Sequence, residues 1–174
     1  MKQKVGIWGL WGFAITSLIG TLLHYLYEWL GKAVWIAPFS GVNESTWEHM
    51  KLLFWPMLIF AVVESFFFRE CRDFWCIKLS GILLGLGLIP LLFYTYNGVI
   101  GKSPDWINIA IFFVSAALAY IYETRRFRAE GRHCISPKLA IILLSVIALA
   151  FIVFTFKAPK LGLFLDPLTG TCGI

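Results

Sequence analysis

Five long apolar stretches, separated by short polar segments, dominate the chain and predict five helices of membrane-spanning length. A helix rises about 1.5 Å per residue, so about 20 apolar residues cross the hydrocarbon core of a bilayer. The expected spans are residues 5–30, 47–68, 74–96, 105–123 and 137–156, followed by a tail over 157–174. The pattern therefore predicts an all-α bundle of five transmembrane helices, forming a single domain over residues 1–174.

Local signals mark where three of these helices begin. Ser45, followed by Glu48 three residues later, fits a capping box, in which the hydroxyl accepts from the Glu48 amide and the carboxylate reaches back. The segments SPD at 103–105 and SP at 136–137 predict further starts, with Ser as the N-cap and Pro at the first helical position.

Other residues predict how the helices bend and pack. Pro56 and Pro90 each remove a backbone hydrogen bond inside a span, which predicts kinks. Gly81 and Gly85 are four residues apart and predict a close contact between two helices. Glu64 lies near enough to the basic loop after its span to pair there.

The composition supports an integral membrane protein. Of the 174 residues, 59% are hydrophobic and 14% are charged, whereas soluble domains average about 45–50% and about 25%. The formal charge of +5 does not indicate nucleic acid, because the basic residues gather in the loops. The N-terminal apolar run is too long for a cleavable signal, and we expect it to be retained as the first span.

The charge distribution predicts the orientation. Cytoplasmic loops of membrane proteins carry an excess of Lys and Arg. Five spans place the loops on two sides, with ten basic residues on one side and five, all lysines, on the other. The N-terminus is therefore expected inside and the C-terminus outside. The expected location is the plasma membrane of a bacterial cell, with the lipid bilayer as the surrounding partner.

Ionisable residues gather at the predicted outer ends of the first two spans. His24 and Glu28 end a polar stripe on one face of the first span, and residues 41–51, GVNESTWEHMK, hold Glu48 and His49. Ionisable groups inside a membrane protein ordinarily face its interior or a water-filled cavity. Imidazole and carboxylate together suit zinc, with three protein ligands and one position open for water.

The leading hypothesis is a metal-dependent hydrolase of a lipid or lipid-linked substrate. Its expected metal ligands are His24, His49 and Asp166, with zinc as the candidate ion. Glu48 is a ligand or general base, and Glu28 is a base or supports a ligand. Further residues expected to contact substrate or ligands are Asn43, Glu44, Trp47, Lys51, Tyr94, Asn97 and Thr169.

Two alternatives use the same residues. Paired His and carboxylate groups also bind protons or small solutes, which fits a non-enzymatic transport subunit in an oligomer or with a partner subunit. The cluster also fits a scaffold, in which it only orders the bundle. The spacing matches no established zinc signature such as HExxH, so it does not decide among these.

Three other segments carry weaker signals. Cys71, Cys76 and Cys134 are expected as free thiols on the cytoplasmic side, although with His133 they offer an alternative zinc site. The apolar loop over 31–44 is expected at the interface, dipping back toward the bundle. The tail is expected to fold over the outer mouth, with Asp166 directed at Glu48 and His49.

The sequence also resembles a family of small multi-pass bacterial membrane proteins without an assigned activity. The resemblance rests on the NESTWEH block at 43–49 and the DPLTG block at 166–170. It implies a membrane location and a set of candidate positions, but no mechanism. Near the end of the chain the family more often has Tyr where this sequence has Cys172, which leaves Cys172 without an implied role.

Overall fold

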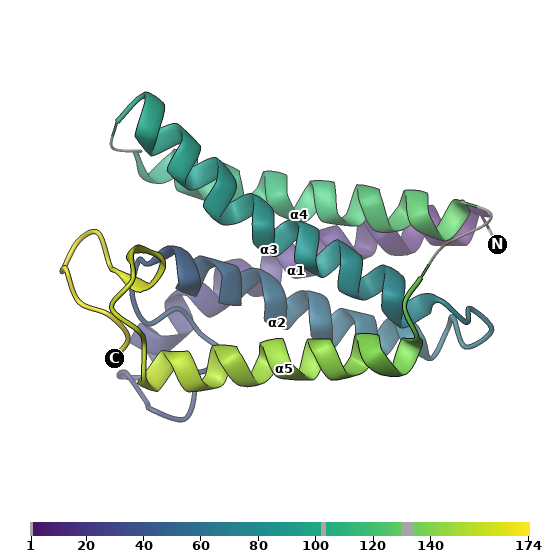
Figure 1. Ribbon diagram of the computed structural model, residues 1–174, viewed down its shortest axis with the longest axis horizontal. Helices are drawn as coiled ribbons and strands as arrows, with labels where there is room; N and C mark the ends of the chain where they lie inside the picture. Colours follow the sequence, from purple (N-terminus) through teal and green to yellow (C-terminus); the bar gives the residue numbers. More distant parts are fainter. Residues whose placement is uncertain (1, 102–103, 130–133) are drawn as a thin grey trace.

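The computed structural model describes residues 2–101, 104–129 and 134–174, and its helices form one elongated bundle (Figure 1). The helices are α1 (Lys2–Trp29), α2 (Thr46–Ser65), α3 (Phe74–Val99), α4 (Asp105–Arg128), α5 (Pro137–Phe156) and a short 3-10 helix, η1 (Gly162–Phe164). Every helix end lies within five residues of the predicted span, and the predicted all-α fold is confirmed. The two termini lie at opposite ends of the bundle.

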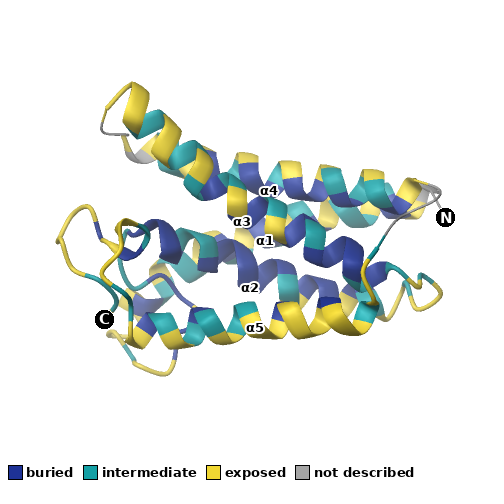
Figure 2. Ribbon diagram, in the orientation of Figure 1, coloured by how far each residue is buried: buried dark blue, intermediate teal, exposed yellow. Residues whose placement is uncertain are grey.

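Four of the five long helices are long and apolar enough to cross a membrane: α1, α3, α4 and α5. The exception, α2, carries Glu48, Lys51 and Glu64, all of which are buried. Most of the residues of α2 are buried beneath the other helices (Figure 2). A central helix can carry such residues because its neighbours shield them from lipid. That α2 crosses the membrane remains a prediction.

The small residues of α3 allow it to pack closely on its neighbours. A Cβ added at Gly81 would overlap the side chain of Glu123 in α4. One added at Gly85 would lie 2.8 Å from Leu53 Cδ2 and 3.3 Å from Ala119 Cβ. The close contact predicted from these glycines is confirmed.

The helix starts follow the sequence signals in part. The Ser45 hydroxyl accepts from the Glu48 amide at 3.4 Å, and the Ser136 hydroxyl accepts from the Leu139 amide at 3.2 Å. The second half of the predicted capping box is wrong, because Glu48 Oε2 accepts instead from the Val42 amide at 3.0 Å. Pro104 takes the N-cap position of α4 rather than its first helical position, and Ser103 lies outside the described residues.

The prediction of free thiols is wrong for two cysteines. Cys76 and Cys134 form a disulfide, whereas Cys71 and Cys172 belong to no disulfide within the described residues. Packing of α3 against α5 brings the two Cα atoms to 5.9 Å, a separation that a disulfide spans easily. The bond removes two of the four groups in the alternative zinc site, and His133, a third, lies outside the described residues.

The loop before α2 folds back into the bundle as predicted. Lys51 Nζ donates to the Ala37 carbonyl at 2.8 Å, and Trp55 Nε1 donates to the Pro38 carbonyl at 2.9 Å. These donors belong to the second and third turns of α2, so the loop reaches well past the start of that helix.

The C-terminal tail also packs on the bundle, which confirms that it folds back. The ring of Phe164 lies 4.7 Å from that of Trp47, centroid to centroid. Asn43 Nδ2 donates to the Gly173 carbonyl at 3.2 Å, and the Ile174 amide donates to the Thr155 carbonyl at 3.3 Å. Both motif blocks of the sequence therefore meet at one end of the molecule.

Candidate metal centre

His24, Glu44 and His49 come together at the end of the bundle where the tail packs. They belong to α1, to the loop before α2 and to the first turn of α2. The Glu44 carboxylate lies between the two imidazoles, with Oε1 3.6 Å from His24 Nε2 and Oε2 3.7 Å from His49 Nε2. One ligand atom from each residue can be chosen so that all three lie within 4.8 Å of one another.

Backbone contacts hold His24 against the loop. A Cβ at Gly20, one turn before His24, would lie 2.9 Å from the Leu52 carbonyl, so glycine allows α1 to approach α2. The Ser40 hydroxyl donates to the Leu23 carbonyl and accepts from the Tyr27 amide, which fastens the loop to the last turns of α1. These contacts fix the position of the backbone that carries His24 relative to the loop.

Glu44 is placed by its neighbours in the loop. The Ser45 amide donates to Asn43 Oδ1 at 2.9 Å, which closes a local turn around Glu44. Glu48 Oε2 accepts from the Val42 amide at 3.0 Å and from Lys51 Nζ at 2.5 Å. The buried Glu48–Lys51 pair therefore anchors the segment that carries Glu44.

The hydrogen bond of His49 favours a metal-binding tautomer. Its Nδ1 lies 3.0 Å from the Ser45 carbonyl, which can only accept a hydrogen bond. A proton on Nδ1 leaves the lone pair of Nε2 directed at Glu44. Metal-ligating histidines are commonly oriented in this way by a carbonyl or carboxylate on the other ring nitrogen.

The three side chains fit a divalent transition metal. Zinc bonds of 2.0–2.2 Å in a tetrahedron place neighbouring ligand atoms about 3.4 Å apart. The two His–Glu separations, each to a different Glu44 oxygen, are 3.6 and 3.7 Å, and one ligand atom from each residue lies within 4.8 Å of the other two, so small side-chain movements would bring the three ligands to a common ion. Two histidines and one glutamate form a ligand set found in catalytic zinc sites, where the fourth position holds water. The side chains are 19–42% exposed, so water can reach that position.

The centre opens on a cleft of about 420 Å³. At this end, the last turns of α3 and the first turns of α4 diverge from α2 (Figure 1). The walls are mainly aromatic and aliphatic, with a few polar side chains near the histidines. Lining residues outside the centre include Thr21, Tyr25, Leu52, Phe93, Asn97, Asn108, Phe112, Phe113 and Leu168.

Asp166 is not among the residues brought together at the centre. It is buried in the tail, where Oδ1 accepts from the Leu168 amide at 2.9 Å and Oδ2 from the Thr169 hydroxyl at 2.8 Å. Both oxygens stabilise a turn that ends at Gly170, whose φ of 71° suits glycine. The expected direction of Asp166 toward Glu48 and His49 is therefore corrected, and Glu44 replaces it as the carboxylate beside the histidines.

The other predicted site residues are scattered around the centre. Glu28 is exposed one turn beyond His24, and Tyr94 is exposed near the end of α3. Trp47 is buried against the rings of Phe151, Phe154 and Phe164, so it supports the tail. Asn97 lines the cleft and caps a backbone carbonyl of its own helix, that of Phe93, at 2.8 Å.

Asn108 was not predicted as a site residue, and Glu44 was predicted to contact substrate or ligands rather than to lie between the two histidines. Asn108 is a lone amide in the apolar pattern of α4, and that isolation was the available signal. Glu44 was expected only to contact substrate or ligands, because its loop offered no periodicity from which to predict direction.

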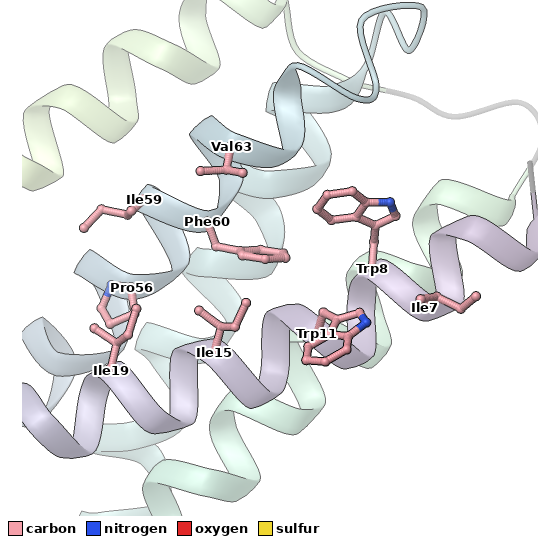
Figure 3. A pocket seen from close by; sticks show the side chains of 9 residues that line it. All are labelled: Ile7, Trp8, Trp11, Ile15, Ile19, Pro56, Ile59, Phe60 and Val63. Carbon is pink, nitrogen blue, oxygen red and sulfur yellow. The ribbon is translucent and has the colours of Figure 1, made fainter.

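A second cavity differs from this cleft in its lining, which has no ionisable side chains. It lies in a groove between α1 and α2, has a volume of about 520 Å³ and is lined only by apolar residues (Figure 3). The groove includes Trp8, Trp11, Pro56, Ile59 and Phe60 and offers no group for catalysis or coordination.

Together these features define an all-α protein with membrane-type helices and a His/Glu/His cluster at one end. The chain belongs to the family of unknown function DUF6512, which matches residues 1–174. This membership confirms the resemblance to a family without an assigned activity. No curated protein and no solved structure matches the chain significantly.

Proposed function

We propose that this protein is a metal-dependent hydrolase of the bacterial plasma membrane that acts on a lipid or lipid-linked substrate. It crosses the membrane several times, with its N-terminus in the cytoplasm and its centre at the outer face. One observation carries the proposal: His24, Glu44 and His49 converge at the mouth of a mainly apolar cleft.

The residues have two proposed roles, which are to coordinate the metal and to position its ligands. His24, Glu44 and His49 would hold the ion, and a divalent metal bound there would supply a water molecule activated for attack near neutral pH. Glu48 is a positioning residue, because its carboxylate is engaged by Lys51 and by the loop amide of Val42. This role replaces the general base predicted for Glu48 from the sequence.

The cleft supports an amphipathic substrate. Phe93, Phe112 and Phe113 form an apolar wall suited to an acyl or isoprenoid chain, whereas Asn97 and Asn108 suit a polar head group. His24, Glu44 and His49 line the same cleft, so a substrate bound in it would lie beside a metal held by these three residues.

Turnover of lipids in vesicles by the purified, zinc-loaded protein tests this function. We expect hydrolysis of an ester, amide or phosphoester lipid that falls at least 100-fold in Glu44→Gln and His49→Ala, because each removes a metal ligand. Glu70→Gln, an exposed acid outside the cleft, is the matched control.

Two outcomes would contradict the proposal. Hydrolysis that survives both ligand variants would place the chemistry elsewhere. Stable zinc binding without turnover of any lipid class would exclude the hydrolase and favour the solute-binding or transport subunit. Glu28→Gln tests the remaining candidate base, because Glu28 lies one helical turn from His24.

A further inference from the structure

A second ionisable cluster lies inside the other end of the bundle. Lys78 of α3 has its Nζ 2.6 Å from Glu64 Oε2 of α2 and 2.5 Å from Glu123 Oε2 of α4. The side chains of all three residues are at most 4% exposed. Three helices thus contribute to one ionic cluster that has almost no contact with solvent.

The cluster is unbalanced in charge. Two carboxylates share a single ammonium, which would leave one net negative charge if all three groups were ionised. In the described part of the chain the cluster contains no second cation. The rings of Tyr120 and Phe60 lie 5.3 and 5.9 Å from Lys78 Nζ.

The remaining surroundings do not offset that charge. From α1 the Thr16 hydroxyl lies 2.7 Å from the Tyr120 hydroxyl and is engaged there. Glu123 Oε1 is buried and has no hydrogen-bond partner among the residues that the structure describes. Burying an isolated carboxylate is costly, and two carboxylates close together favour a state in which one of them holds a proton.

We infer that Glu64, Glu123 and Lys78 form a proton-binding site, in which the two carboxylates hold one proton at neutral pH beside the charged lysine. The bound proton makes the cluster neutral. Exchange of this proton would switch the bundle interior between neutral and negative states, an ability used by proton-binding membrane proteins.

The Glu48–Lys51 pair of the same helix α2 provides a matched comparison. It holds one carboxylate and one ammonium 2.5 Å apart, both buried. This pair is neutral without an added proton. Replacing its glutamate leaves an uncompensated lysine, whereas replacing one glutamate of the larger cluster leaves a balanced pair. The same Glu→Gln change should therefore have opposite consequences at the two places.

The inference is independent of the metal centre. His49 and Glu64 are 15 residues apart on α2, which corresponds to about 22 Å along a helix. A failure of the proton site leaves the hydrolase proposal intact, and the reverse also holds.

Infrared spectroscopy of the full-length protein in detergent tests the proton site directly. At neutral pH we expect a carbonyl stretch from one buried protonated carboxylic acid, shifted by deuterium exchange. The band should vanish in both Glu64→Gln and Glu123→Gln, because each leaves one carboxylate paired with Lys78, and should persist in Glu48→Gln. A wild-type spectrum without the band, or a band retained in both cluster variants, would overturn the inference.

Thermal unfolding supplies a second readout from the same samples. The midpoint should change little in Glu123→Gln, whose amide resembles a protonated acid, and fall clearly in Glu48→Gln. An equal or larger fall in Glu123→Gln would show that both carboxylates are ionised and would overturn the proton site.

Discussion

The disulfide between Cys76 and Cys134 makes a quantitative prediction about stability. The two cysteines are separated by 58 residues, which include most of α3 and all of α4. Closing a loop of that length restricts the unfolded chain and should stabilise the fold by about 4 kcal/mol. Reduction, or Cys76→Ser, should lower the free energy of unfolding by this amount.

Two measurements on the purified protein check the prediction. Thiol titration after denaturation should detect two thiols without reductant and four with it, since Cys71 and Cys172 belong to no disulfide in the described part of the chain. Unfolding in a denaturing detergent should then show the stability loss on reduction. The Cys71→Ser variant is the control and should respond to reductant as the wild type does.

Other results would refute this reasoning. Four thiols before reduction would mean that the bond does not form. A disulfide whose reduction leaves stability unchanged would mean that other contacts already hold α3 and the start of α5 together, so the loop length does not set the stability.

The disulfide also bears on orientation. The positive-inside pattern places the Cys76 end of the bundle in the cytoplasm, where thiols are ordinarily kept reduced. The charge distribution thus favours the cytoplasmic side for this end, whereas the disulfide favours the extracytoplasmic side. Determining the orientation experimentally decides which signal governs this protein.

Two further predictions concern packing and orientation. Gly81→Ala should destabilise the bundle by about 1–3 kcal/mol, because the added carbon overpacks against Glu123. Gly87→Ala is the control: nothing lies within 4 Å of its added carbon, so it should stabilise the helix by up to about 1 kcal/mol through helix propensity. Equal unfolding midpoints for the two variants would contradict the close contact at Gly81. The second experiment uses whole cells that express a background in which Cys71 and Cys172 are replaced. A maleimide that does not cross the membrane should label Lys160→Cys but not Glu70→Cys, both at exposed positions. The reverse labelling pattern would invert the proposed topology.

Helix positions were predictable because the relevant signals are local. Apolar runs of membrane length fix where helices form, and Ser45 and Ser136 mark two of the starts. The Gly81–Gly85 spacing also indicated a packing face before any partner was known. Each of these inferences depends on residues within one or two helical turns of one another.

The details of the two ionic sites depend on contacts between distant segments. Lys78 follows a basic loop and was counted with it, yet it packs inward between Glu64 and Glu123. Glu64 therefore pairs with Lys78, the last residue of the segment that was counted as the basic loop, which the structure places inside α3. The sequence brought attention to His24 and His49, but only the folded loop shows that Glu44, rather than Asp166, lies between them.

Metal binding by His24, Glu44 and His49 is the central claim, and elemental analysis of the detergent-purified protein tests it most directly. After zinc loading and removal of excess metal, we expect about one zinc per chain, lost in His24→Ala and His49→Ala but retained in Asp166→Asn if the tail stays folded. Protein without bound metal, or zinc that persists in both histidine variants, would contradict the metal centre.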